Sequence, residues 1–117
     1  MALKVPGLFK NAQKTMQVDA GTEVFREGDT GAEMYGIVSG EIELRIDGRV
    51  IRTLGADDVF GEMAIVDSAP RSATAVATTD TMLAVINRHR FLFLVQETPT
   101  FALQVMSAMA ARLRSDD

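Results

Sequence analysis

The chain has 117 residues, a length that favours one compact domain, and its 47% apolar residues are enough for a hydrophobic core. It contains no run of eighteen or more apolar residues, which argues against a membrane-spanning helix, and residues 1–16 lack the apolar stretch of a secretory signal. The absence of cysteine excludes disulfides, thiolate metal sites and cysteine nucleophiles, and a reducing cytoplasm is the simplest setting. A net charge of −4 with dispersed basic residues argues against nucleic-acid binding, which normally needs a basic face.

The N-terminal segment, about residues 1–15, is expected to be helical around Gly7-Leu8-Phe9. Residues 16–86 contain about eight short apolar stretches that are separated by turn signals. This spacing predicts a mainly β fold: an eight-stranded antiparallel β-barrel or jelly roll, a double-stranded β-helix, followed by two C-terminal helices.

The clearest strands of this region flank a hairpin. Ile42, Leu44 and Ile46 alternate with polar residues, which is the two-residue period of a half-buried strand. Asp47-Gly48 then provides a two-residue turn, and the chain returns over Arg49 to Leu54.

Residues 87–114 change to a helical period. Asn87 is a good N-cap for a first helix, and Thr98-Pro99 is a helix start for a second. On the second helix we expect one stripe to pack on the barrel, whereas a second stripe has the spacing of a short coiled-coil seam for a protein partner or a homodimer. The first stripe is Phe101, Val105 and Met109, and the second is Leu103, Met106, Ala110 and Leu113. No linker interrupts the chain, so residues 1–117 are predicted to form a single domain.

The most informative stretch runs from Phe60 to Thr74. Gly61 permits close approach of a ligand to the backbone, and a short helix beginning near Glu62 would leave N–H groups free for an anion. Arg71 adds a permanent cation whose planar fork suits phosphate oxygens, and the N–H groups that follow from Ser72 could point the same way. Glu62 would repel a bare anion, but its carboxylate could accept a hydrogen bond from a hydroxyl group beside a phosphate. The alternative is a simple Glu62–Arg71 salt bridge.

The motif Phe60-Gly61-Glu62-Met63-Ala64-Ile65 with Pro70-Arg71-Ser72-Ala73-Thr74 resembles the phosphate-binding cassette of the cyclic nucleotide-binding domain family. That family includes catabolite-activator-type bacterial regulators and regulatory subunits of cyclic AMP-dependent kinase. The resemblance extends outward through Glu27-Gly28-Asp29 and Ser39-Gly40-Glu41, and it covers roughly residues 8–114.

The resemblance implies a role for each cassette residue. Glu62 should accept a hydrogen bond from the ribose 2′-hydroxyl, and Arg71 should pair with the cyclic phosphate. Ile65 should be the hinge that contacts the helix after the barrel. The remaining ligand-lining residues should be Gly61, Met63, Ala64, Ser72 and Ala73.

Ser72 does not decide the base, because in the family a hydroxyl at this position can contact the phosphate or favour guanine. We favour cyclic AMP over cyclic GMP. Two departures from the family pattern lie outside the cassette. Asp57 stands at a turn position where glycine is usual, and Gly36 lies inside a strand that is normally bulky, which would mark a bulge or a close ligand approach.

The sequence therefore predicts a cytoplasmic regulatory sensor and not an enzyme. A cyclic nucleotide would be its only ligand, with no other cofactor, and its C-terminal helices would repack on binding. His89 is the only histidine, so a metal site is not expected. A structural or dimerisation module that binds no nucleotide is the alternative. Affinity, oligomeric state, downstream effector, and whether the chain is a stand-alone protein or a fragment of a larger regulator stay open.

Overall fold

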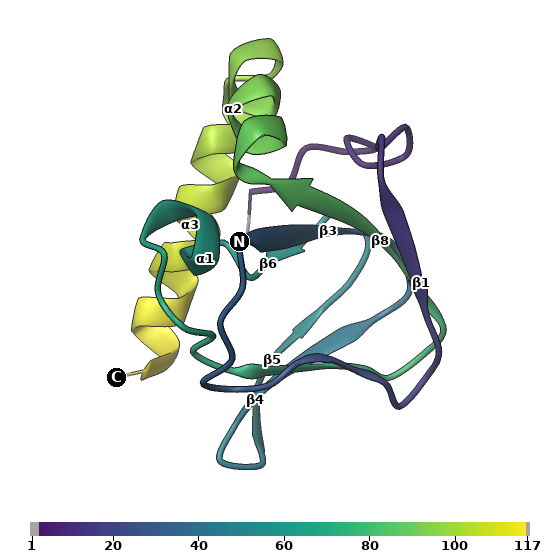
Figure 1. The fold of residues 1–117 in the computed structure, drawn as a ribbon, viewed down its shortest axis with the longest axis vertical. Coiled ribbons are helices and arrows are strands. Elements are labelled where there is room, and N and C mark those ends of the chain that lie inside the picture. The colour runs from purple at the N-terminus through teal and green to yellow at the C-terminus, as the bar shows by residue number, and fades with distance from the viewer. Residues whose placement is uncertain (1–2, 117) are drawn as a thin grey trace.

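The structure, a computed structural model, describes residues 3–116 and consists of two four-stranded antiparallel sheets with helices against one side (Figure 1). The first sheet has the order β1 (Thr15–Val18), β8 (Thr81–Asn87), β3 (Glu33–Ser39), β6 (Val59–Phe60). The second has the order β2 (Glu23–Phe25), β7 (Thr74–Ala77), β4 (Ile42–Ile46), β5 (Arg49–Leu54).

The mainly β fold and its eight strands are confirmed. Of the two predicted forms, a barrel or a jelly roll, the barrel is not closed. No ladder joins the two sheets among the described residues, because hydrogen bonding ends at β1 and β6 in one sheet and at β2 and β5 in the other. Two of these edge strands, β2 and β6, have only 3 and 2 residues. The longest ladder, between β3 and β8, runs from Glu33 opposite Asn87 to Ser39 opposite Met82.

The main hydrophobic core lies between the two sheets. Ile42 and Leu44, predicted to face inward, have 0% and 4% of their surface exposed, and Phe60 has 1%. The predicted hairpin is present, since Asp47 and Gly48 both have positive φ angles, 51° and 78°, as a type I′ turn requires.

Three helices accompany the sheets: α1 (Met63–Val66), α2 (Arg88–Glu97) and α3 (Thr100–Asp116). The Asn87 side chain caps α2 as predicted, because it accepts a hydrogen bond from the backbone N–H of Arg90 at 2.8 Å. A second core forms where α2 and α3 pack on the first sheet, and Phe101 and Val105 of the predicted inward stripe are buried in it. None of the helices within residues 3–116 is long and apolar enough to cross a membrane.

The N-terminal segment differs from expectation. Residues 6–11 form consecutive turns with bonds from Lys10 N–H to the Gly7 carbonyl and from Ala12 N–H to the Phe9 carbonyl, not an α-helix, whereas residues 1–2 lie outside the described part. Phe9 itself is buried and contacts Phe101 edge to face, with ring centroids 6.1 Å apart.

Candidate functional site

The cassette begins with a sharp change of backbone direction at Gly61. Its φ of 77° lies in the left-handed region, and a Cβ there would stand 2.9 Å from Nη1 of Arg71. Only glycine satisfies both demands. The turn leads into α1, whose first α-helical bond runs from Val66 N–H to the Glu62 carbonyl at 3.0 Å.

Arg71 is held from several sides although its guanidinium has no carboxylate partner within the described residues. Its Nη1 donates to the Gly61 carbonyl at 3.1 Å, and its guanidinium carbon lies 4.2 Å from the ring centroid of Phe25. A Cβ on Gly31 would stand 2.7 Å from the guanidinium carbon. Only 7% of Arg71 is exposed, and its Nε is buried without a partner, so the group is desolvated and ready to donate.

The backbone of Arg71 is fixed by the turn before β3. Its N–H donates to the Asp29 carbonyl, and its carbonyl accepts from Gly28 N–H, both at 2.7 Å. The segment Glu27-Gly28-Asp29, part of the resemblance, thus sets the position of the cassette arginine.

Glu62 is the second buried charged group, with 3% of its surface exposed. Burial raises the pKa of its carboxyl group above the ordinary value of 4.5, opposed by its own backbone N–H and by the charges of Arg112, Arg52 and Arg71. No Glu62–Arg71 ion pair forms in the described structure, so the simple salt-bridge interpretation is wrong. A buried carboxyl group without an ion-pair partner is costly unless a ligand uses it.

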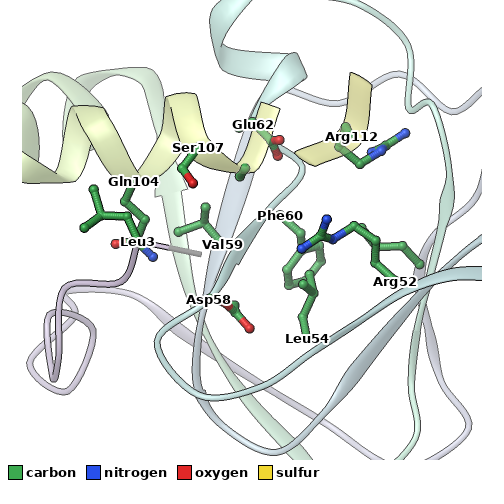
Figure 2. A pocket seen from close by; sticks show the side chains of 12 residues that line it. Leu3, Arg52, Leu54, Asp58, Val59, Phe60, Glu62, Gln104, Ser107 and Arg112 are labelled. Atoms are coloured by element: carbon green, nitrogen blue, oxygen red, sulfur yellow. The ribbon is translucent and has the colours of Figure 1, made fainter. Parts of the chain in front are cut away.

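Two small cavities meet at Glu62. The cassette cavity, of about 20 Å³, is lined by Gly61, Glu62, Met63, Ala64, Pro70, Arg71, Ser72 and Ala73, together with Phe25, Leu44 and Arg112. The Glu62 cavity, of about 30 Å³, continues towards β5 and α3 and is shown in Figure 2. All seven predicted ligand-lining residues therefore surround the cassette cavity. Each of the two cavities has room for little more than one water molecule.

Arg112 of α3 borders both cavities and has no counterpart in the sequence prediction. Its Nη2 donates to the hydroxyl oxygen of Ser72 at 2.8 Å, and its Nε is buried without a partner. The helical period offered a signal, because Arg112 is seven residues after Val105 and eleven after Phe101, the stripe predicted to pack on the sheets.

Ile65, the predicted hinge, is 3% exposed and belongs to the second core with Leu94, Phe101 and Val105. Its carbonyl accepts a hydrogen bond from Nη1 of Arg88 at 3.0 Å. The cassette is thus in direct contact with α2 and α3.

The structure explains Asp57 and Gly36, the two residues that depart from the family pattern. Asp57 has a φ of 72°, and its side chain accepts from Gly7 N–H at 3.0 Å. Gly36 makes room for a protein side chain and not for a ligand, because a Cβ there would stand 2.6 Å from the ring of Phe9. His89 is exposed, and no group of three potential metal-ligating side chains occurs among the described residues.

The cassette thus places a buried arginine and a buried carboxyl group, without an ion pair between them, around one cavity. The family model of the cyclic nucleotide-binding domain matches residues 15–98, and the chain belongs to this family.

Known relatives agree with this assignment. The chain is 36% identical over 102 residues to the cyclic AMP receptor protein of Thermus thermophilus, covering 83% of this chain and 47% of that protein. It is 36% identical over 84 residues to a cAMP-dependent protein kinase regulatory subunit of Eremothecium gossypii, covering 72% and 18%. The crystal structure of Thermus thermophilus catabolite activator protein superimposes with a TM-score of 0.74 at 34% identity, covering 89% of this chain and 51% of that one. The chain thus spans about half, or less, of the length of these relatives.

Proposed function

We propose that this chain is a regulatory sensor that binds a cyclic nucleotide in the cassette cavity. Arg71 pairs with the cyclic phosphate, and Glu62 accepts a hydrogen bond from the ribose 2′-hydroxyl. Gly61, Met63, Ala64, Ser72 and Ala73 line the phosphate and ribose. The chain itself catalyses no reaction and contacts no nucleic acid, and it acts in the cytoplasm.

The observation that carries the proposal is the state of Glu62 and Arg71. Both are buried, both line the same cavity, and they do not neutralise each other. Two buried groups of this kind are costly without partners, and one molecule with a negative charge for Arg71 and a hydrogen-bond donor for Glu62 would supply both partners.

The small size of the cavities supports a coupled movement. A nucleotide is far larger than the cavities of about 20 and 30 Å³, and Arg112 of α3 borders both, so its entry would displace the Arg112 side chain. Because Ile65 packs in the same core as Phe101 and Val105, a change in the cassette would reach α2 and α3 directly. Binding would then select a state in which the C-terminal helices are repacked, through its different affinity for the two arrangements.

Cyclic AMP is the first candidate ligand, since both relatives described above carry it in their names. Cyclic GMP is the second, because Ser72 presents a hydroxyl group at the cassette.

A dimerisation module that binds no nucleotide is the competing function. It is favoured by the exposed apolar side chains of the predicted seam on α3, since Leu103, Met106 and Leu113 are 54%, 51% and 69% exposed. A homodimer or a protein partner on this face is also compatible with nucleotide binding.

Calorimetric titration of the chain with cyclic AMP and with cyclic GMP tests the proposal, with the molar mass measured by light scattering before and after. We expect saturable binding of at least one nucleotide and its loss in Arg71→Ala and Glu62→Ala. Arg49→Ala, which removes an exposed charge on β5, is the control and should bind normally. A folded chain that binds neither nucleotide and forms a stable dimer would establish the competing function.

A further inference from the structure

The side chain of Gln104 joins α3 to two distant parts of the chain. Only 2% of this residue is exposed, and both ends of its amide group are hydrogen-bonded. Its Nε2 donates to the Asp57 carbonyl at 2.6 Å, and its Oε1 accepts from the Val5 N–H at 3.1 Å. One buried amide therefore ties α3 to the turn before β6 and to the N-terminal segment.

The N-terminal segment, here residues 3–12, is also anchored directly to the turn before β6. The Gly7 N–H donates to Oδ1 of Asp57 at 3.0 Å, and Nζ of Lys4 lies 3.4 Å from Oδ2 of Asp58. The turn is fixed in its own right, because the Asp57 N–H donates to a carbonyl of β3 at 2.8 Å. The segment, the turn and α3 thus form one bonded unit with the buried amide at its centre.

This unit closes one side of the Glu62 cavity. Gln104, Ser107 and Arg112 line the cavity from α3, and Leu3 lines it from the N-terminal segment. Figure 2 shows the three α3 side chains in order along the helix, and their spacing places them on one helix face. Moving this face outward enlarges a cavity of about 30 Å³ towards the size of a nucleotide, and it also breaks both hydrogen bonds of the amide.

We propose that Gln104 and the N-terminal segment form an autoinhibitory latch, which holds α3 closed over the Glu62 cavity and so weakens the binding of cyclic nucleotide. The inference rests on the proposed function. Opening the latch is costly, because it leaves the Val5 N–H and the Asp57 carbonyl without their partner. When the open state is rarely populated, the apparent Kd exceeds the intrinsic Kd in proportion. Weakening the latch therefore strengthens binding, whereas removing a ligand contact weakens it.

The test is a set of calorimetric titrations of the chain and its variants with cyclic AMP and with cyclic GMP. Gln104→Met conserves the side-chain volume and removes both hydrogen bonds, so we expect the affinity to rise roughly 5- to 150-fold. Gln96→Met is the matched control, since it removes an exposed glutamine from α2 and should leave the affinity unchanged.

Asp57→Gly weakens the latch without touching α3 or the cavities. Asp57 lines neither cavity, and glycine accepts its φ of 72°. The variant removes only the side-chain acceptor of the Gly7 N–H, so the affinity should rise roughly 2- to 10-fold.

Amide hydrogen exchange of the ligand-free chain gives a readout that a ligand contact cannot change. Gln104→Met and Asp57→Gly should both exchange faster than the unmodified chain over residues 4–8 and 101–112. Adding saturating cyclic nucleotide to the unmodified chain should also speed exchange over residues 4–8, because binding opens the latch.

The outcomes separate this inference from the function on which it rests. If the unmodified chain binds a cyclic nucleotide and Asp57→Gly binds it no more tightly, the latch is wrong while the proposed function stands. Tighter binding by Asp57→Gly, with faster exchange in its ligand-free state, supports the latch even if Gln104→Met folds poorly. Failure of the folded, unmodified chain to bind either nucleotide overturns both.

Discussion

Nη2 of Arg112 lies 2.8 Å from the hydroxyl oxygen of Ser72, so a side chain of the last helix donates a hydrogen bond to a cassette residue 40 positions earlier. The same arginine borders both cavities at Glu62. The contact joins the end of α3 to the cassette.

Arg112→Ala should therefore loosen the end of α3 without unfolding the domain. A single partly exposed hydrogen bond is worth only about 0.5–1.5 kcal/mol, so we expect faster amide hydrogen exchange over residues 108–114 and a small change in Tm. Ser72→Ala should produce the same local effect, and the double variant should add little to either, because both remove one interaction. Arg114→Ala, an exposed arginine on the same helix, is the control. Additive effects of the two single variants would show that the contact does not hold α3.

Glu62→Gln should stabilise the ligand-free chain at neutral pH. Burial raises the pKa of the Glu62 carboxyl group above 4.5, so the folded state holds this proton more tightly than the unfolded state does. The contribution of Glu62 to stability is therefore greatest below pH 4.5 and is lost as the pH rises through the raised pKa. Glutamine keeps the shape and removes the titration. Urea unfolding between pH 4 and 8 should show that the free energy of unfolding of the unmodified chain falls as the pH rises, and that it falls less in Glu62→Gln. Identical slopes in the two chains would contradict the raised pKa of Glu62.

If Glu62 accepts the ribose hydroxyl as proposed, nucleotide affinity should depend on pH in the opposite direction. Only the ionised carboxylate accepts the ribose hydroxyl without competing as a donor, so affinity should rise with pH through the raised pKa of Glu62. Titrations with cyclic AMP in buffers of different ionisation enthalpy should detect protons released on binding in acidic solution. Glu62→Gln should bind more weakly and release none, and equal proton release by both chains would place the titrating group elsewhere.

The strands, the hairpin and the cassette could be predicted from the sequence because each has a local signature: alternation around Leu44, the Asp47-Gly48 turn, and the fixed spacing of Glu62 and Arg71. The choice between a closed barrel and two separate sheets could not, since it depends on which strand ends pair across long distances. Arg112 and Gln104 were missed for a related reason. Both lie on α3, far from the cassette in sequence, and only the packing brings them to the Glu62 cavity.

Arg71→Lys should impair binding nearly as much as Arg71→Ala. Lysine retains the charge but not the planar fork, and it cannot stack on the Phe25 ring, which lies 4.2 Å from the guanidinium carbon. Since hydrogen bonds between charged groups are worth about 1.5–3 kcal/mol, the loss should be roughly 10- to 150-fold in Kd for either cyclic nucleotide. Circular dichroism of each variant controls for folding. Near-normal affinity in Arg71→Lys would mean that charge alone, and not the fork, holds the phosphate.

Gly36→Ala should destabilise the domain through the N-terminal segment and not through the site. An added Cβ would stand 2.6 Å from the Phe9 ring, which is wedged between this strand and α3. Overpacking of this kind costs roughly 1–3 kcal/mol, enough to lower Tm by several degrees in a domain of this size.

The chain offers a matched control in Gly55→Ala, because Gly55 has no atom within 4 Å of the position of its Cβ and lacks a positive φ. A smaller side chain at position 9 should relieve the clash with the added Cβ. The loss of stability in Gly36→Ala should therefore be smaller in a Phe9→Leu background. If Gly36→Ala instead lost nucleotide affinity at unchanged Tm, Gly36 would face the ligand after all. An unchanged penalty in the Phe9→Leu background would mean that the strain comes from the backbone of β3 and not from the ring.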